Sequence, residues 1–182
     1  MLTFIYGCMG SSKTAQALIK RFNYIENGIQ VWLIKPSTDT RDGENKIRSR
    51  IGLEAETCVI RPDDNICVRY PGTNVIVADE SQFFTKEQIE QLRDLADHDV
   101  QVYAYGLKTN FKTELFEGSK RLIELADEVQ EIVTTCECGH KATVNARLDK
   151  DGRVVLAGRE VLLGGNDRYK AMCHKCFIEK SK

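Results

Sequence analysis

The chain has 182 residues, of which 42% are hydrophobic and 29% are charged, with 26 Lys and Arg against 27 Asp and Glu. This composition is ordinary for a globular protein with one sizeable core and a small appendage, and it argues against a disordered chain. A formal net charge of −1 provides no strong basic field for the phosphates of DNA or RNA, so we expect no nucleic-acid partner.

No apolar run approaches the roughly 20 residues that a membrane helix needs. The N-terminal MLTFIYG also lacks the charged leader and long apolar stretch of a signal peptide. We therefore expect a cytoplasmic protein without a membrane partner, in which the seven cysteines do not form disulfides. Three of these cysteines, Cys8, Cys58 and Cys67, are scattered along the chain and are interpreted as idle thiols.

The first part of the chain predicts two strands with a helix between them. The strands are the short apolar runs LTFIYG (2–7) and VWLIKP (31–36). The helix is expected over 13–28, because apolar residues recur there at helical spacing. These residues are Leu18, Phe22 and Ile25. Residues 37–50 are polar and predict an exposed, mobile loop.

The same alternation continues from NVIVADE (74–80), which predicts another strand. An amphipathic helix is expected from Thr85 to His98, because Thr85 and Gln88 have the spacing of a capping box. VQVYAYGL and VQEIVTT predict two further strands, separated by a helix over about 114–126. Strands that alternate with helices in this way predict an α/β fold with a parallel sheet and helices on its faces.

The pattern changes after residue 133. Two pairs of cysteines bracket about 35 residues that include RVVLAGREVLLGG (153–165), for which we predict a short hairpin. We therefore divide the chain into an α/β domain, residues 1–133, and a small C-terminal domain, residues 134–182.

Residues 7–14, GCMGSSKT, follow a predicted strand and open a predicted helix. They match the phosphate-binding pattern G-x-x-x-x-G-K-[ST], except that Ser12 replaces the glycine in sixth place. In such a loop, backbone N–H groups cradle a phosphate, Lys13 reaches its outer oxygens and the hydroxyl of Thr14 binds Mg²⁺. A side chain at position 12 costs about 1 kcal/mol if the backbone there favours glycine. The alternative is a strand–turn–helix corner without a ligand.

All eight residues of this loop are candidate phosphate ligands: Gly7, Cys8, Met9, Gly10, Ser11, Ser12, Lys13 and Thr14. Asp79 and Glu80 end a later strand, where Asp79 is suited to hold Mg²⁺ and Glu80 to act as a general base. Acidic residues are common at strand ends, so the pair is informative only together with the loop. The two motifs favour an enzyme that hydrolyses a nucleotide or transfers its phosphate.

Four cysteines near the C-terminus, Cys136, Cys138, Cys173 and Cys176, have the number and pairing of a structural zinc site. Because C-x-C is tighter than the usual C-x₂-C, His140 or His174 is an alternative fourth ligand. Four sulfur ligands leave no open position for water, so we expect a structural metal, with free thiols or a redox pair as alternatives.

Taken in order, these motifs resemble the cellular type II, zinc-containing thymidine kinase family over nearly the whole chain. The similar segments are GCMGSSKT, KPSTDTRDGENKIRSRIG, VADESQFF, GLKTNFKTELFEGSKRLIELAD and LLGGNDRYKAMCHKC. The resemblance implies a P-loop NTPase-like (RecA-like) α/β fold. It also implies a small C-terminal zinc-binding domain with a lasso loop, about 151–165, that covers the substrate.

The resemblance further implies ATP- and Mg²⁺-dependent phosphorylation of thymidine, and of deoxyuridine, at the 5′-hydroxyl in nucleotide salvage. Glu80 would be the general base, and Arg41, Asp79 and Gln82 would assist the loop in binding ATP. The implied nucleoside contacts are Met9, Phe83, Leu107, Phe111, Phe116, Leu162, Gly164 and Tyr169. A homotetramer and feedback inhibition by dTTP are implied as well.

Two alternatives to the kinase are considered. One is a catalytically impaired protein of the same fold that senses dTTP, with Ser12 spoiling the phosphate geometry. Retention of Glu80 argues against it, because a sensor needs no base. The other is a zinc-ribbon nucleic-acid module fused to an ATPase, which the neutral charge disfavours.

Overall fold

The computed structural model describes residues 1–40, 43, 45–158 and 168–181. Its centre is a six-stranded sheet in which every adjacent pair of strands is parallel, in the order β5-β2-β6-β7-β1-β8. The strands are β1 (Leu2–Tyr6), β2 (Val31–Pro36), β5 (Cys58–Ile60), β6 (Val75–Ala78), β7 (Gln101–Gly106) and β8 (Glu128–Glu131). The predicted parallel α/β sheet is confirmed.

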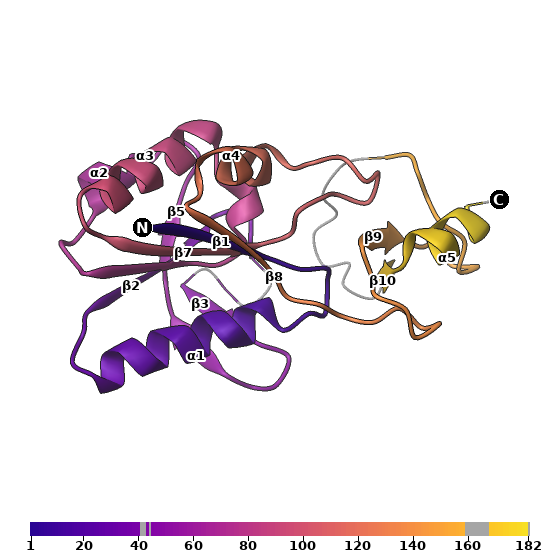
Figure 1. Cartoon of the computed structure of the whole chain (residues 1–182), viewed down its shortest axis with the longest axis horizontal. Helices are drawn as coiled ribbons and strands as arrows, with labels where there is room; N and C mark the ends of the chain where they lie inside the picture. The colour runs from indigo at the N-terminus through magenta and orange to yellow at the C-terminus, as the bar shows by residue number, and fades with distance from the viewer. Residues whose placement is uncertain (41–42, 44, 159–167, 182) are drawn as a thin grey trace.

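Helices cover both faces of this sheet (Figure 1). They are α1 (Lys13–Glu26) on one face and, on the other, α2 (Ile66–Arg69), α3 (Lys86–Asp97) and α4 (Glu117–Leu125). Successive side chains of a strand point to opposite faces, so β6 contributes to two cores. Ile76 packs in one core with Leu92 of α3, whereas Val77 packs in the other with Leu18 of α1.

The start of α3 confirms the predicted capping box. The Thr85 hydroxyl accepts a hydrogen bond from the Gln88 backbone N–H, and the Gln88 side chain accepts one from the Thr85 N–H, both at 3.2 Å. Ile89 and Leu92 are fully buried on the side of the helix that faces the sheet. The sequence therefore predicted both the start of this helix and its buried face.

Helix α1 forms where the sequence predicted it, but its apolar stripe is only partly buried. Leu18 is 6% exposed and packs on the sheet with Ala17, whereas Phe22 is 58% and Ile25 42% exposed. The helical periodicity thus predicted the helix, but Phe22 and Ile25 lie outside the face that this chain buries.

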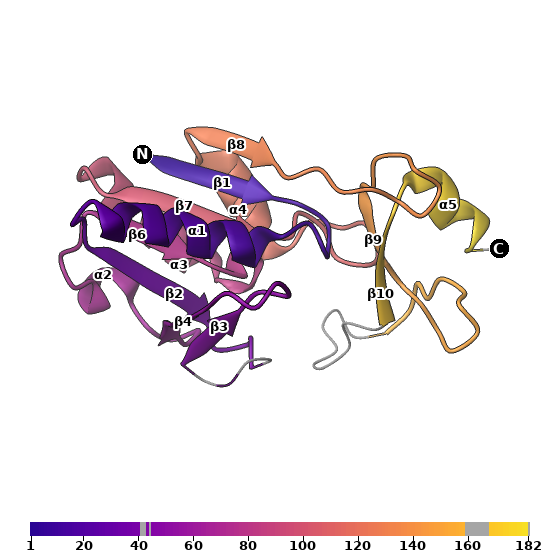
Figure 2. The same ribbon diagram turned by 90° about the horizontal axis from the view of Figure 1, so that it is seen from below.

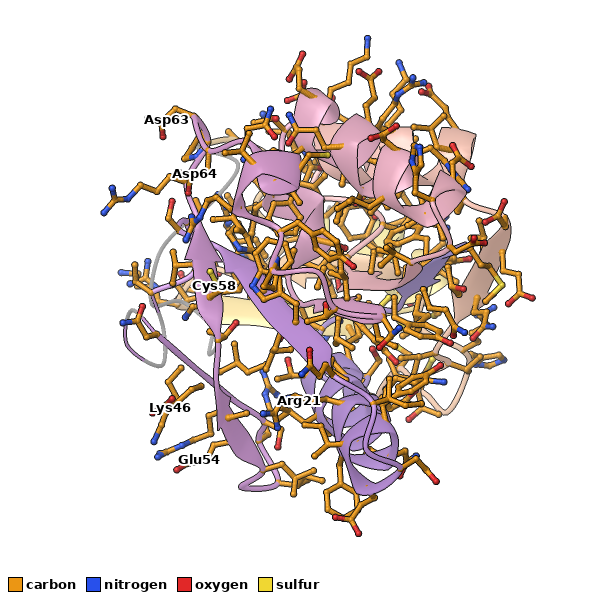
Figure 3. The ribbon with its side chains drawn as sticks, turned by 90° about the vertical axis from the view of Figure 1, so that its left-hand side faces the viewer. Arg21, Lys46, Glu54, Cys58, Asp63 and Asp64 are labelled. Carbon is orange, nitrogen blue, oxygen red and sulfur yellow. The ribbon has the colours of Figure 1, made fainter. Side chains whose placement is uncertain are left out.

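The segment 37–50, predicted as an exposed loop, is partly a β-hairpin. Strand β3 (Lys46–Arg48) pairs antiparallel with β4 (Glu54–Glu56), and Ile47 is 1% exposed in the core beside α1. The carboxylate of Glu54 binds both basic side chains of β3, as Figure 3 shows for Lys46. The loop prediction was wrong here because one buried isoleucine and cross-strand charge pairs outweigh the polar composition.

Helix α4 begins at Glu117, three residues later than predicted. The Asn110 side-chain oxygen accepts hydrogen bonds from the backbone N–H groups of Lys112 (2.9 Å) and Glu114 (3.1 Å). Such local side-chain bonds compete with helix formation. Residues 107–116 therefore form a turn after β7, closed by a bridge between Thr109 and Leu115.

The C-terminal part contains the antiparallel pair β9 (Val144–Arg147) and β10 (Tyr169–Met172), followed by α5 (His174–Glu179). It has its own apolar cluster, centred on Val144, Met172 and Phe177. Figure 2 shows that the carboxyl ends of β1 and β8 point toward this unit. The hairpin predicted within 153–165 falls largely outside the described residues, and the part that is described makes only an isolated bridge from Val154 to Leu148. In the parts of the chain that the structure describes, every helix is too short or too polar to span a bilayer.

Candidate active site

The phosphate-binding motif forms the turn between β1 and α1. Ser12 has φ 64° and ψ 22°, in the left-handed region that favours glycine, and it is the N-cap of α1. Gly7 lies so close to the end of β8 that a Cβ there would be 2.7 Å from the Ile132 carbonyl oxygen. The loop therefore has glycine-like geometry at position 12, and Ser12 adopts it at a cost of about 1 kcal/mol.

The ammonium group of Lys13 lies inside this loop. Its Nζ donates hydrogen bonds to the carbonyl oxygens of Gly7 and Cys8, both at 2.9 Å, and to Ser11 Oγ at 3.4 Å. Lys13 is only 9% exposed, so its ammonium group is held within the loop. Burial raises the pKa of the neighbouring Cys8 thiol, which keeps a competing negative charge out of the loop.

Two buried acids follow β6. Asp79 is 2% and Glu80 8% exposed, and Glu80 has φ 50°, also in the left-handed region. Burial, and then the charge of Asp79, raise the pKa of Tyr105 on the neighbouring strand. A buried carboxylate on a strained backbone at the end of a central strand is typical of a functional site.

Gln82 orients Glu80. Its Nε2 donates to Glu80 Oε2 at 2.6 Å, while its Oε1 accepts a hydrogen bond from the Leu107 N–H at 2.9 Å. The carboxamide thus connects the acid after β6 to the end of β7. The resemblance assigned Gln82 to ATP, whereas the structure places its side chain on the candidate base.

The loop and the acids open into one pocket of about 580 Å³. The predicted site residues on its lining are Met9, Gly10, Ser12, Lys13, Thr14, Asp79, Glu80 and Leu107. Arg41, Leu162 and Gly164 lie outside the described residues. The pocket therefore unites the predicted phosphate loop with both predicted acids and with two of the predicted nucleoside contacts, Met9 and Leu107.

The hairpin β3–β4 supplies lining that sequence reasoning missed. Residues 48–52 at its tip line the pocket, and the Arg50 guanidinium lies 3.8 Å from where a Cβ on Gly10 would be. Asp39 is another missed lining residue, 5% exposed, with its carboxylate 3.8 Å from the ammonium of the fully buried Lys35. Arg50 was visible in the sequence, but the hairpin that brings it to the loop was not.

The predicted aromatic contacts form two groups, and none of their side chains is on the pocket lining. Phe83 and Phe116 meet edge to face with ring centroids 5.5 Å apart. Phe111 is 1% exposed, and the guanidinium carbon of Arg147 lies 3.5 Å from its ring centroid. Arg147 Nε also donates to the Tyr169 hydroxyl at 2.9 Å. Arg147 was missed because nothing in the sequence predicted strand β9, on which it lies.

The four predicted metal ligands converge. The Sγ atoms of Cys136, Cys138, Cys173 and Cys176 all lie within 4.8 Å of one another, and those of Cys138 and Cys173 are 3.6 Å apart. Tetrahedral zinc with Zn–S bonds of about 2.3 Å requires S–S distances of about 3.8 Å, so the thiols fit such an ion. Among the described residues, the cluster contains no histidine, although His140 Nδ1 lies 3.4 Å from Cys138 Sγ. The candidate donor set is therefore four thiols.

Hydrogen bonds from the backbone of Cys138, and then from that of Cys173, lower the pKa of the Cys136 thiol to about 6. Hydrogen bonding with the Cys138 and Cys173 thiols instead raises the pKa of Cys176. Cys136 therefore favours the thiolate form and Cys176 the neutral thiol. A divalent cation would stabilise all four cysteines as thiolates.

A glycine-like loop between a central strand and a helix, facing acids at the end of another central strand, defines the class: an α/β nucleotide-binding protein of the P-loop type. The family model described as thymidine kinase matches residues 1–177.

The chain is similar to named thymidine kinases from several bacteria. It is 41% identical to one from Coxiella burnetii, over 97% of this chain and 94% of that protein. It is 39% identical to one from Rhodopirellula baltica (98% and 88%) and 38% identical to one from Shewanella oneidensis (98% and 96%). The chain belongs to the thymidine kinase family.

Proposed function

We propose that this protein transfers the γ-phosphate of ATP to the 5′-hydroxyl of thymidine, and of deoxyuridine, giving dTMP and ADP in nucleotide salvage. The observation that carries the proposal is one pocket lined both by Lys13 of the phosphate loop and by the buried Glu80. A phosphate site alone would serve any nucleotide-binding protein. A base beside it, in a chain of this family, serves transfer to a hydroxyl.

The phosphate loop and α1 hold the triphosphate. Backbone N–H groups and the positive end of the α1 dipole bind its oxygens, and the Lys13 ammonium exchanges its carbonyl partners for a more negative acceptor. Thr14 and Asp79 are suited to hold Mg²⁺, both lining the pocket. When bound, the ion supplies positive charge to the bridging and terminal phosphate oxygens.

Glu80 accepts the proton of the 5′-hydroxyl as the oxygen bonds to the γ-phosphorus. Gln82 keeps the carboxylate in place through its hydrogen bond to Oε2, and the low exposure of Glu80 limits competition from water. The leaving ADP carries away the bonding electron pair of the broken P–O bond. Arg41 and Arg50 are proposed to offset the charge that develops on the transferred group.

The nucleoside is proposed to lie against Met9, Leu107 and the adjoining aromatic side chains. Leu162 and Gly164 belong to the lasso loop that the family resemblance places over the base. A flat pyrimidine is well matched by aromatic walls and main-chain hydrogen bonds. Excluding water there would limit hydrolysis of ATP.

Three further proposals follow from the family resemblance. The protein is proposed to form a homotetramer, to be inhibited by dTTP and to be cytoplasmic. One structural feature supports self-association. Ile19, Phe22 and Ile25 are 46%, 58% and 42% exposed on α1, an amount of exposed apolar surface that a further copy of the chain would cover.

Phosphorylation of a nucleoside panel by the purified chain with ATP and Mg²⁺ tests the activity. We expect dTMP from thymidine and dUMP from deoxyuridine, and no product from deoxycytidine or purine nucleosides. Absence of transfer to any nucleoside, in folded protein that binds dTTP, would instead support the dTTP-sensor alternative. No feature of the described residues favours that alternative, because loop, lysine and both acids are all in place.

A further inference from the structure

One buried side chain of the C-terminal unit reaches the phosphate loop. Asn145 lies on β9 and is 4% exposed. Its Oδ1 accepts a hydrogen bond from the backbone N–H of Met9 at 2.8 Å, and its Nδ2 donates one to the carbonyl oxygen of Thr109 at 3.1 Å. The two partners leave no choice in the orientation of the carboxamide, because an N–H can only donate and a carbonyl oxygen can only accept.

These partners belong to different walls of the pocket. Met9 is the third residue of the phosphate loop and lines the pocket, and Thr109 lies two residues beyond Leu107, which also lines it. Asn145 is 136 residues from Met9 and 36 from Thr109 in the sequence. A single carboxamide from a third segment therefore connects the two walls.

The bond to Met9 is short and directional, whereas the neighbouring contact from Cys8 Sγ to the Ala142 carbonyl is 3.6 Å long and uses a weak thiol donor. Removing a buried carboxamide would leave the Met9 N–H and the Thr109 carbonyl without these bonds, which is unfavourable for buried polar groups. The two walls would then be free to move apart.

We infer that Asn145 is a positioning residue for phosphoryl transfer: it holds the phosphate loop and the 107–111 segment at the separation that brings the bound nucleoside to the γ-phosphate. The inference rests on the proposed function, which assigns the first wall to ATP and the second to thymidine. Transfer rates are steep in this separation, since a misplacement of about 1 Å can cost roughly 100-fold.

Asn145→Leu, which keeps the volume and removes both hydrogen bonds, is the test variant. Gln88→Leu is its matched control, because Gln88 is also a buried carboxamide, 2% exposed, that ties two segments together through Thr85 and Arg61, but it is not on the pocket lining. At a temperature where both variants are folded, we expect Asn145→Leu to raise the KM for thymidine about 10-fold and to lower kcat at least as much, from two lost bonds. Gln88→Leu should stay within about twofold of the unmodified protein in both constants.

Hydrogen exchange at the Met9 amide gives a readout that does not depend on activity. Asn145→Leu should speed exchange at Met9 by about 10-fold or more, whereas Asn145→Asp, which keeps an acceptor oxygen, should preserve most of the protection. A chain that phosphorylates no nucleoside would overturn the proposed function and the catalytic part of this inference, while fast exchange in Asn145→Leu would still support the bridge. Unchanged Met9 exchange in Asn145→Leu, or kinetics equal to those of Gln88→Leu, would overturn the positioning role.

Discussion

Ser12 shows how one residue can depart from a motif without disturbing its geometry. The backbone at position 12 is left-handed, as a glycine there would be, so the motif is preserved in conformation although not in composition. The sequence identified the position and the size of the cost. The sequence could not determine whether Ser12 would adopt the left-handed backbone of a glycine or whether the loop would take another conformation.

Replacing Ser12 by glycine should stabilise the protein. The folded chain holds Ser12 in the left-handed region, so its strain is part of the folded state, and Ser12→Gly should raise the free energy of unfolding by about 0.5–1 kcal/mol. Ser11→Gly is the control, because Ser11 has no positive φ and its hydroxyl accepts a hydrogen bond from Lys13. Urea denaturation that shows both variants equally destabilised would contradict the strain argument.

Arg50 should contribute to ATP binding rather than to nucleoside binding. It lies at the hairpin tip against Gly10, so Arg50→Ala should raise the KM for ATP by about 10-fold and change that for thymidine less than twofold. Lys46→Ala is the control on the same hairpin, since Lys46 is paired with Glu54 and is not on the pocket lining. Equal kinetics for the two variants would remove Arg50 from the phosphate site.

At the scale of elements, the sequence predicted those whose signals are local. The capping box fixed the start of α3, and the apolar runs located the central strands β1, β2, β6 and β7. The missed elements depend on pairing with a partner strand. Strand β3 is polar and exists because it pairs with β4, and β9 is defined by its ladder to β10.

The same division applies to the site. Lys13, Asp79 and Glu80 stand in motifs that can be read along the chain. The roles of Asp39, Asn145 and Arg147 depend on which segments meet in three dimensions. No spacing within the sequence specifies those contacts.

The exposed apolar side of α1 is proposed to be an interface between copies of the chain. Phe22→Glu places a charge on it and should reduce the oligomer measured by light scattering after gel filtration, from a tetramer to smaller species. Val68→Glu is the control, because Val68 is 82% exposed on α2, on the opposite face of the sheet. A monomeric unmodified protein, or a tetramer that survives Phe22→Glu, would contradict this assignment of the α1 surface.

At the scale of the whole molecule, two cores built on a parallel sheet carry the phosphate loop and the acids, and a separate apolar cluster supports the cysteines. The division into residues 1–133 and 134–182 remains a proposal. The loop residue Cys8 packs against the third cluster, so the two parts share an interface at the active site.

Structural zinc should be part of the folded protein. The four thiols fit a tetrahedral ion, so elemental analysis should give about one zinc per chain, and Cys136→Ser should lower the zinc content and the melting temperature together. Cys58→Ser is the control, a free cysteine outside the cluster, and it should retain the metal. Pure, folded and active protein without zinc would show that the thiols are not a structural metal site.

The central claim is that Glu80 is the base for transfer of phosphate to thymidine, and single-turnover transfer of labelled γ-phosphate tests it most directly. Glu80→Gln should slow transfer by about 100-fold or more while the dissociation constant of ATP changes less than twofold, because the amide cannot take the proton. Glu87→Gln, an exposed acid in the first turn of α3, should transfer phosphate at the unmodified rate. An unchanged transfer rate in Glu80→Gln would contradict the assignment of the base and with it the proposed mechanism.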